Sequence, residues 1–545
     1  MTTYQYQTIA IFSKPLINTI RALTILIISI CSSTNVYSNH PPDNPRDLFE
    51  YYILGDSYSY PAAESFCISY TADHLRAAFT GCIEGTNFVR CSDSVWGGAR
   101  CLVSFYCRHE DGTFNVDSPA IKGNGYCPGA VATGKNVGRT STSCPVLKGN
   151  PINIGTGNKF QTEVDYTSPI KGGLQYRRYY NSFGKGLKTR YSPGWSADYW
   201  QRISQTINPD YVTVTRPDGR IIQFEFRDNS WTKDPDVVEK LEEITDGQGN
   251  RTGWLLTTAD DFVEEYAIDG VGRPIKITDR NGFATTLEYN LSVAEGFDGL
   301  SNSLDRVTDP FGRTLTFHYD TEFHLIYVID PDGNKINYSR DANGNLISVT
   351  YPDETPADSN DNPKRLYHYE DTNFLNYLTG ITDETSARFA TWGYDAQGRA
   401  IFSEHAGGVE RIDITYNSNG SVTVTDSSGL IQTYNFEIQH GVVKIAQVSG
   451  GPCPNCGQIQ NMTYDANGFV ASRTDFNGNV TTFINNAQGL QTSRTEVVGT
   501  PEERTITTEW HPTFRLPTRI TETGKITTFT YDAQGRLIER KEEGS

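Results

Sequence analysis

The sequence predicts a mostly β protein, in which a small disulfide-rich N-terminal domain precedes a long twisted antiparallel sheet that forms a partial shell. Three observations predict this fold. Glycine (49 residues) and tyrosine (31) are abundant and methionine is rare (2), as in chains of many short strands and turns. An Asp-x-x-Gly motif recurs through the second half of the chain, and most of the cysteines gather in one N-terminal segment. A recurring unit of nearly fixed length determines a fold more strongly than any single local motif.

Length and composition exclude several classes of protein. With 545 residues, the chain is long enough for two or more domains and a sizeable core. Its 65 acidic and 47 basic residues give a net charge of −18, which argues against nucleic acid as a partner. The mean hydropathy of −0.49 and the lack of long apolar runs after the N-terminus exclude a polytopic membrane protein. With 37% hydrophobic and 12% aromatic residues, the chain is expected to fold.

Residues 1–38 have the features of an export signal peptide. Lys14 and Arg21 precede the apolar run 22–30, whose length suits a signal sequence and is short for a membrane span. Small or short side chains at the end of the segment predict cleavage after Ser38. The protein is therefore expected to be secreted or displayed at the cell surface, and to fold in an oxidising compartment.

The predicted disulfide-rich domain covers residues 39–147. The gaps between its cysteines match no repeated metal-binding spacing, so in an exported chain they predict a disulfide framework. A further pair, Cys453 and Cys456, forms a C-x-x-C motif between glycines, for which we expect a structural disulfide or a turn. Zinc binding and redox chemistry are the alternatives for that pair. The clustered cysteines are odd in number and their pairing is open: Cys67, Cys82, Cys91, Cys101, Cys107, Cys127 and Cys144.

The Asp-x-x-Gly motif predicts a tight turn between successive strands. Its aspartate can accept a hydrogen bond from a backbone N–H two residues later, and its glycine tolerates positive φ. Neighbouring glycines of this kind lie about 10 residues apart, the length of one short strand and one turn. Between turns, apolar and polar residues alternate, as at Leu315, Phe317 and Tyr319, which predicts one buried face. The predicted turns include Asp309 with Gly312, Asp330 with Gly333, Asp395 with Gly398, Asp465 with Gly468 and Asp532 with Gly535.

The region before these turns resembles the module that opens the core of RHS proteins. Residues 148–235 contain an Asn-Pro run that leads into Thr-Gly-x-Lys, then Arg-x-Tyr-Asn-Ser, then Gly-Trp, in the order typical of the family. Tyr-Asp turns at 394–395, 464–465 and 531–532 resemble the YD repeats of the same family, and assign the repeat sheet to residues 236–545. The opening-module match rests on Asn150, Pro151, Thr156, Gly157, Lys159, Arg178, Tyr180, Asn181, Ser182, Gly194 and Trp195.

The RHS resemblance implies a hollow shell of spiralling strands, which in that family often encloses a toxic C-terminal domain. This sequence departs from the family pattern, because it has neither an Asp-Pro-x-Gly-Leu core motif nor an effector tail after its last repeat turn. The repeat region is also expected to be too short to close a cage. The sequence therefore predicts a partial wall with open edge strands. Further RHS repeats or a toxin domain encoded downstream are the expected partners.

No motif in the sequence predicts catalysis, a cofactor or a metal site. Residues 129–136 have P-loop spacing, but Asn136 occupies the position of the magnesium-binding hydroxyl, so a glycine-rich loop is expected. The oxygen-rich segments 330–334 and 358–362 raise calcium binding as an alternative to a pure turn role. The histidines are scattered, and there is no distinctive carboxylate pair or Gly-x-Ser-x-Gly elbow, which leaves hydrolysis as a minor alternative.

Taken with the resemblance, these features predict a non-enzymatic secreted or cell-surface scaffold. The RHS resemblance implies the shell portion of a polymorphic toxin delivery system used in competition between bacteria. The alternative function is a surface module of adhesin type that binds carbohydrate or a neighbouring cell. Trp392 and Trp510 are the candidates for stacking on the sugar rings of a surface glycan, although aromatic residues in strands are expected mainly to pack the sheet.

Overall fold

The computed structural model is almost entirely β in the residues it describes, as the sequence predicts. The chain divides into two compact units, Met1–Thr133 and Gly134–Ser545. Among the described residues no helix is both long and apolar enough to cross a membrane. The described residues are 35–38, 51–54, 84–94, 98–108, 114–117, 133–138, 146–184, 192–205, 209–268, 272–291, 302–355, 361–451 and 459–544.

The first unit contributes five strands to the described part of the chain. β1 (Asn35–Ser38) pairs with β2 (Tyr51–Leu54), and β3 (Glu84–Ser94), β4 (Gly98–Arg108) and β5 (Phe114–Asp117) form an antiparallel sheet. The register of β3 and β4 places Cys91 opposite Cys101. The side chains of this unit lie outside the described residues, and so do the predicted disulfides, most of the export signal and the Cys453–Cys456 motif.

The second unit opens with two small sheets that occupy the predicted opening module. A short helix, α3 (Thr133–Asn136), precedes them. The first sheet has the order β10-β9-β8-β7-β6, and the second is the meander β11-β12-β13-β14. Their strands are β6 (Leu147–Lys148), β7 (Ile152–Asn153), β8 (Asn158–Thr167), β9 (Gln175–Asn181), β10 (Trp195–Ala197), β11 (Arg202–Gln205), β12 (Tyr211–Thr215), β13 (Ile221–Arg227) and β14 (Ser230–Lys233).

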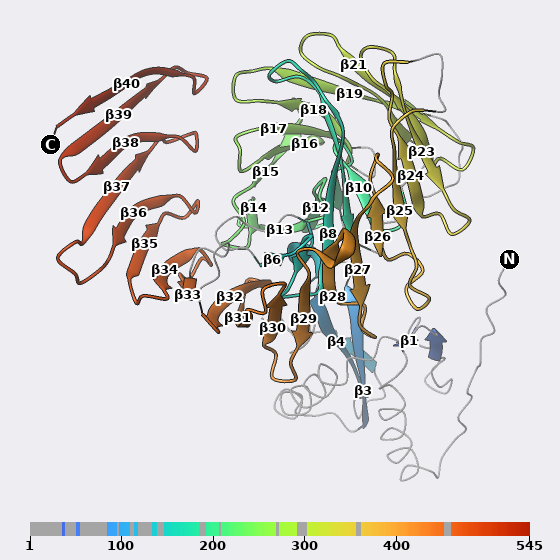
Figure 1. Ribbon diagram of the computed structural model, residues 1–545, viewed down its shortest axis with the longest axis horizontal. Coiled ribbons are helices and arrows are strands. Elements are labelled where there is room, and N and C mark those ends of the chain that lie inside the picture. Colours follow the sequence, from blue (N-terminus) through green and yellow to red (C-terminus); the bar gives the residue numbers. More distant parts are fainter. Residues whose placement is uncertain are drawn as a thin grey trace. The chain divides into compact units, whose positions relative to one another are not determined.

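The rest of the unit is one 26-stranded antiparallel sheet in which every strand pairs with its neighbours in the chain. Figure 1 shows these strands curving around β8–β10. A 3-10 turn, η1 (Ala406–Gly408), follows β28. The strands are β15 (Lys240–Thr245), β16 (Arg251–Thr257), β17 (Val263–Ala267), β18 (Pro274–Thr278), β19 (Ala284–Leu291), β20 (Asn302–Thr308), β21 (Thr314–Tyr319), β22 (Leu325–Ile329), β23 (Lys335–Arg340), β24 (Leu346–Thr350), β25 (Lys364–His368), β26 (Gly380–Thr382), β27 (Arg388–Tyr394), β28 (Ala400–His405), β29 (Ile412–Tyr416), β30 (Val422–Asp426), β31 (Ile431–Gln439), β32 (Val442–Ser449), β33 (Ile459–Tyr464), β34 (Val470–Asp475), β35 (Val480–Asn485), β36 (Gln491–Glu496), β37 (Arg504–Trp510), β38 (Pro517–Glu522), β39 (Lys525–Tyr531) and β40 (Leu537–Glu543).

The Asp-x-x-Gly motifs form the turns of this sheet. At Asp330, one carboxylate oxygen accepts the backbone N–H of Asp332 and of Asn334, both at 2.9 Å. Gly333 has a φ of 87°, which costs an L-residue strain but glycine little. The backbone closes the turn through Gly333 N–H to Asp330 O at 3.0 Å and Asp330 N–H to Asn334 O at 2.9 Å. The same bonds to the first aspartate occur at Asp309, Asp395, Asp465 and Asp532.

The turn glycines differ in what surrounds them. Gly312, Gly398 and Gly468 all have positive φ, at 82°, 76° and 84°. Around Gly312 the space is open, so backbone conformation alone accounts for the glycine. A Cβ on Gly398 would come within 2.9 Å of the Tyr377 hydroxyl oxygen, and one on Gly468 within 2.6 Å of Lys444 Nζ. The sequence explains these glycines by φ alone, whereas at Gly398 and Gly468 the structure adds the close approach of a neighbouring side chain as a second reason.

The tyrosine of the Tyr-Asp turns braces the sheet through its hydroxyl. Tyr394 donates to Leu378 O at 2.6 Å, two residues before the preceding strand β26, and Tyr319 donates to Leu304 O at 2.9 Å, within the preceding strand β20. The ladder to the following strand shifts register at these tyrosines. The same brace recurs at Tyr289, Tyr416, Tyr464 and Tyr531, and its donor is a different side chain at Arg340, Asn485 and Trp510.

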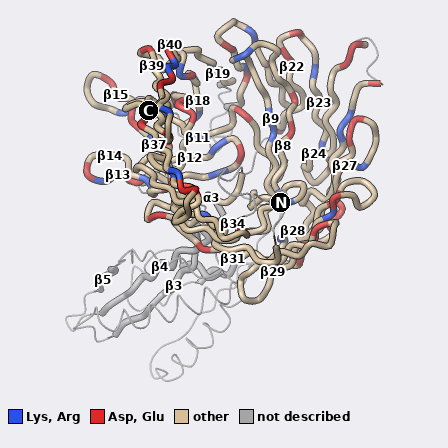
Figure 2. Tube along the Cα trace, turned by 60° about the vertical axis from the view of Figure 1, so that its left-hand side comes forward, with Lys and Arg blue, Asp and Glu red and all other residues tan. Residues whose placement is uncertain are grey.

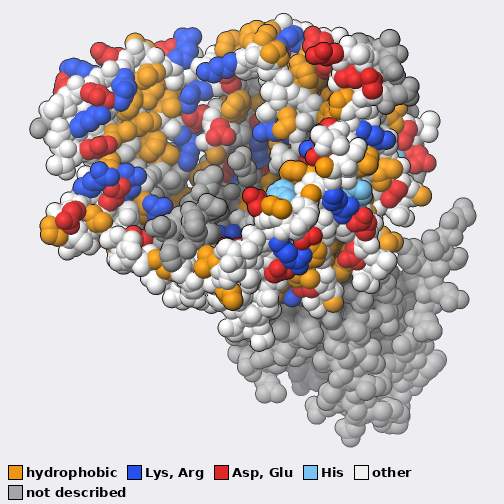
Figure 3. Space-filling view, viewed as in Figure 1, with side chains coloured by type: hydrophobic (Ala, Val, Ile, Leu, Met, Phe, Trp, Pro, Cys, Tyr) orange, Lys and Arg blue, Asp and Glu red, His pale blue; other side chains and the backbone are white. Residues whose placement is uncertain are grey.

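Alternation along the strands builds one main core. Leu315 and Phe317 of β21 are buried, as are equivalent residues of β22–β32, and they pack against Ile152, Tyr180 and Trp195 of the opening module. Charged residues lie at many of the hairpin turns (Figure 2). In β34, β35, β36 and β38 most side chains are only half-buried. Figure 3 shows hydrophobic side chains gathered over the C-terminal strands. The core is thus densest where the module lies against the sheet.

Replacing Tyr394 by Phe tests the brace. The substitution removes the hydroxyl and leaves the carbonyl of fully buried Leu378 without that donor. We expect a loss of about 1–3 kcal/mol in the free energy of unfolding, the usual cost of an unsatisfied buried acceptor, measured by urea denaturation. Tyr327→Phe is the matched control, because the Tyr327 ring stacks on His318 and its hydroxyl forms no such brace in the described part of the chain. Equal losses in both variants would contradict the role of the brace.

The aspartates of the Asp-x-x-Gly turns predict that the stability of the fold falls at acidic pH. Hydrogen bonds from the Ser428 hydroxyl and then from the backbone N–H groups of Leu430 and Ser428 lower the pKa of Asp426. A lowered folded-state pKa contributes stability above the unfolded value, about 3.9, and this stability is lost as the pH falls through the folded pKa. Asn486 already fills the same turn position and accepts the same backbone N–H groups, so Asp426→Asn should fold normally near neutral pH.

The measurement is the melting temperature of each variant between neutral pH and pH 3. Asp426→Asn should match the parent at neutral pH and lose less stability on acidification. Asp228→Asn is the control, since Asp228 closes no Asp-x-x-Gly turn. An acid dependence that is the same in the parent and in Asp426→Asn would show that the Asp426 carboxylate is not what acid disrupts at this turn.

Candidate functional site

In the described part of the chain, a fully buried pair of charges lies where the opening module meets the repeat sheet. Arg178 of β9 and Asp165 of β8 have side chains that are 0% exposed. Their groups pair in a bidentate way: Arg178 Nε lies 2.6 Å from Asp165 Oδ2, and Nη2 lies 2.9 Å from Oδ1. Such fork-to-fork geometry fixes both distance and orientation, which a single contact does not. We call Arg178, Asp165 and their tyrosine partners the buried hub.

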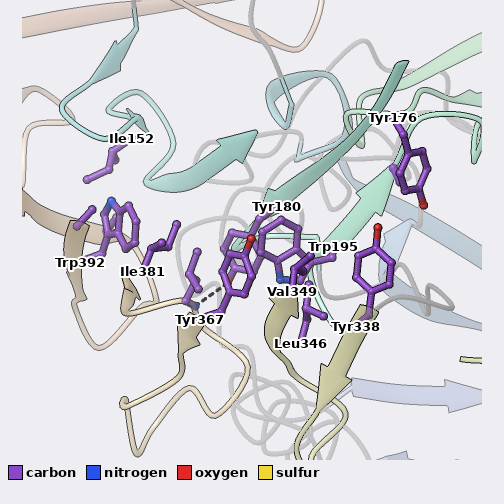
Figure 4. Close-up of a cluster of buried hydrophobic side chains, with 14 of the residues drawn as sticks. Ile152, Tyr176, Tyr180, Trp195, Tyr338, Leu346, Val349, Tyr367, Ile381 and Trp392 are labelled. Carbon is purple, nitrogen blue, oxygen red and sulfur yellow. Dashed lines mark hydrogen bonds between the residues drawn. The ribbon is translucent and has the colours of Figure 1, made fainter. Parts of the chain in front are cut away.

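Three tyrosines of the repeat sheet complete the hub. The hydroxyl of Tyr338 in β23 donates to Asp165 at 2.8 Å, and that of Tyr351, just after β24, donates to it at 2.9 Å. Arg178 Nη2 donates to the hydroxyl of Tyr367 in β25 at 2.8 Å. The hub therefore ties two strands of the module to three consecutive segments of the sheet. Figure 4 shows Tyr338, Tyr367 and Trp195 within this cluster.

The surroundings of Arg178 keep its guanidinium group protonated. Burial opposes the guanidinium charge, but the Asp165 carboxylate and the Tyr367 hydroxyl outweigh it and raise the pKa of Arg178 well above its ordinary value. The guanidinium also lies 4.9 Å from the ring centroid of Trp195 and 5.3 Å from that of Tyr367. Aromatic faces stabilise a desolvated cation. Burial, and then the nearby Asp165 charge, raise the pKa of Tyr338, so this hydroxyl stays a donor.

A second anchor surrounds Lys159, which is also fully buried. Its amine donates to Asn150 O at 2.7 Å, Phe160 O at 2.6 Å and Gln161 Oε1 at 2.8 Å. It lies 4.0 Å from the ring centroid of Trp392 in β27, whose indole N–H donates to Asn150 O at 2.6 Å. Burial lowers the pKa of Lys159. Trp392 is thus a core residue of this anchor, which confirms the packing role expected for aromatic residues and removes it as a sugar-stacking surface.

The structure brings most residues of the opening-module match into these contacts. Tyr180 accepts the N–H of Leu378 and donates to Asn376 O. Asn181 accepts the N–H of Gly138 and the amide of Asn158. Their arrangement is structural, because each of these buried polar groups has a named partner in the module or in the sheet. Trp510, the other sugar-stacking candidate, is half-buried and donates to a backbone carbonyl as a brace.

The sequence did not single out the other half of the hub. Asp165, Tyr338, Tyr351 and Tyr367 look like ordinary alternating strand residues, and the tyrosines lie far from Asp165 in sequence. The only available signal was the pairing of Arg178 with a nearby acid on an adjacent strand. A single sequence gives no way to choose Asp165 over the other acids of the module.

The P-loop-like run has a structural role in the described part. Lys135 pairs with Asp236 at 2.6 Å and Asp234 at 3.0 Å, and also donates to His440 O at 2.8 Å. Asn136 donates to Gly441 O and accepts the N–H of Val443. Lys135 therefore joins the β14–β15 connection to the β31–β32 turn, and Asn136 holds the short helix α3 to the same turn. The lysine is engaged by carboxylates, which is the opposite of the phosphate environment that a P-loop lysine needs.

Among the described residues, no group of three or more His, Cys, Asp or Glu side chains is placed to hold a metal ion. One oxygen of Asp330, in the first calcium candidate, accepts two backbone N–H groups and the other accepts the amide of Asn334. The second candidate falls partly outside the described residues, as does the C-x-x-C motif. Calcium and zinc therefore remain sequence hypotheses for those segments.

One comparison with known proteins falls on the opening module. A family model described as a domain of unknown function, DUF6531, matches residues 149–224, from just after β6 into β13. No curated protein matches the chain.

Among solved structures, the chain is similar to the TcdB2–TccC3 crystal structure, at 11% identity and a TM-score of 0.36, over 98% of this chain and 34% of that one. It is similar to the Photorhabdus luminescens Tc holotoxin pore at 11% identity and a TM-score of 0.27, over 73% and 26%. It is also similar to the N-terminal domain of the effector SpvB from Salmonella typhimurium at 11% identity and a TM-score of 0.18, over 53% and 98%. The chain spans about a third of the length of the TcdB2–TccC3 chain.

Removing one of the two charges of the buried hub should strongly destabilise the fold. Arg178→Met leaves Asp165 buried without its cation, and we expect a loss of about 3–5 kcal/mol in the free energy of unfolding. Urea denaturation followed by tryptophan fluorescence measures the loss. Arg388→Met is the control, since it breaks a partly exposed pair with Glu370 and should cost about 0–1 kcal/mol.

The double variant Arg178→Met with Asp165→Leu separates charge from packing. It removes both charges together, so it should be less destabilised than the sum of the two single variants. Losses that simply add would show that the two side chains act independently and would contradict the hub.

Proposed function

We propose that the protein is a non-enzymatic secreted or cell-surface scaffold of RHS type, the shell portion of a polymorphic toxin delivery system for bacterial competition. The observation that carries this proposal is the curved 26-stranded sheet locked onto the opening module by the buried hub. A wall built of repeating hairpins can be lengthened one hairpin at a time, because each repeat packs only against its neighbours. The Tyr-Asp turns and the ordered opening motifs of the sequence support the RHS assignment.

The chemistry of the buried charges supports a scaffold over a reaction centre. Arg178, Asp165 and Lys159 are enclosed and bonded to fixed protein groups, and their environments hold the module in place. A catalytic group needs access to a substrate and a pKa suited to proton transfer near the working pH. The partner that the proposal requires is a toxin domain or further repeats, encoded downstream or delivered by a separate chain.

A competition assay tests the proposal. In-frame deletion of the coding sequence for residues 39–545 should abolish killing of a sibling strain that lacks the same gene cluster, and the parent should release or display the protein outside the cell. A strain carrying Arg178→Met should lose killing, whereas one carrying Arg388→Met should keep it, because only the first loses the hub. Undiminished killing by the deletion strain would overturn the proposal. Retention of a sugar on a glycan array by the purified protein would favour the carbohydrate-binding alternative.

A further inference from the structure

The two ends of the repeat sheet meet turn against turn. The backbone N–H of Arg515, in the β37–β38 turn, donates to Asp261 Oδ2 in the β16–β17 turn at 2.9 Å. One hairpin further on, Gly535 of the β39–β40 turn lies against the β18–β19 turn, where a Cβ on this glycine would come within 2.8 Å of Arg280 Cδ. Arg280 also pairs with Asp261 at 3.7 Å. We call this line of contacts the seam.

The contacts of the seam repeat at successive hairpin turns on both sides. Asp261 and Arg280 belong to successive turns in one row, and Arg515 and Gly535 belong to successive turns in the row that faces it. Hairpins on one edge repeat every two strands, about 9.6 Å apart for strands separated by about 4.8 Å, so two such rows can mesh one turn to one turn. The next turn along the first edge is the β20–β21 turn, which begins at Asp309.

That next turn exposes an aromatic pair. Phe311, within the β20–β21 turn, and Phe283, at the end of the β18–β19 turn, are each 49% exposed, and their ring centroids lie 5.9 Å apart. Figure 3 shows hydrophobic side chains gathered at the top of the view, where hairpins of this region end. Two adjoining exposed phenylalanines are an apolar surface of the kind that a partner covers. At the neighbouring position of the seam, Gly535 of a repeat turn lies against the methylene part of the Arg280 side chain.

In the described part of the chain, the row of turns that contains Arg515 and Gly535 ends with the β39–β40 turn, and β40 is the last strand of the sheet. This strand pairs only with β39 there, and Leu537 and Ile538 on it are exposed. An antiparallel hairpin added to β40 would use the unpaired backbone edge, and its far turn would lie one step beyond Gly535, opposite Phe311.

We propose that Phe283 and Phe311 are the docking platform for a further repeat hairpin that adds to β40, with the glycine of its Asp-x-x-Gly turn packed on the two rings. This inference rests on the proposed shell function and names the surface on which that shell continues. It requires a partner with the chemistry of this chain's own repeats: a small, flat turn with positive φ at glycine, followed by an alternating strand.

The test extends the full chain after Gly544 with a second copy of residues 523–544, which contain β39, the turn from Asp532 to Gly535, and β40. Hydroxyl-radical footprinting then measures oxidation of phenylalanine side chains. We expect several-fold less oxidation of Phe311 and Phe283 in the extended chain. Phe323 lies in the turn at the opposite ends of these strands and should be oxidised equally in both chains. An extension of scrambled sequence and equal length should give no protection.

Two outcomes would overturn the platform. The first is slow amide exchange in the added strands while Phe311 and Phe283 are oxidised as before. The second is fast amide exchange in the added strands although β40 offers an edge. Phe311→Asp in the extended chain should abolish the protection of Phe283 while β39 remains protected. The footprint is independent of killing, so failure of the platform and failure of the proposed function are distinguishable.

Discussion

The second unit depends on one bidentate pair, Arg178 with Asp165, held entirely away from water. Two such charges are expensive to desolvate, and three tyrosine hydroxyls and the aromatic faces around Arg178 offset part of that cost. Apolar packing alone would hold the module to the sheet with little preference for position. We infer that the pair fixes which strands of the sheet meet β8 and β9, because its hydroxyl partners come from β23, β25 and the residue after β24.

The sheet itself is assembled from short-range rules. An aspartate closes each turn by accepting two backbone N–H groups, a positive φ lets the chain reverse, and a tyrosine hydroxyl ties the turn to the preceding strand. None of these contacts spans more than about one hairpin, so the wall can lengthen strand by strand. Departures from the consensus are tolerated when they keep the geometry: Phe323 adopts a φ of 62° where glycine is usual, and Asn486 accepts the turn N–H groups as aspartate does.

Much of the fold was predictable because its determinants are local. The spacing of the turns predicted the antiparallel strands, and alternation at Leu315 and Phe317 predicted the buried face. The hub was not predictable, because Tyr338, Tyr351 and Tyr367 lie far from Asp165 in the chain and have the same local pattern as many other tyrosines. Nor did the sequence predict that the opening module divides into two separate sheets, β6–β10 and β11–β14. That separation depends on which edge each strand finds, and the single sequence does not specify it.

Hydrogen–deuterium exchange along residues 134–545 tests the central claim most directly, that the hub turns a sheet of local hairpins into a rigid wall. Local opening is rarest where a segment has the most buried contacts. The account predicts the slowest exchange in β8, β9 and β21–β27, around Arg178 and Asp165, and progressively faster exchange toward β40. Slowest exchange in β33–β40, or uniform exchange along the sheet, would contradict it.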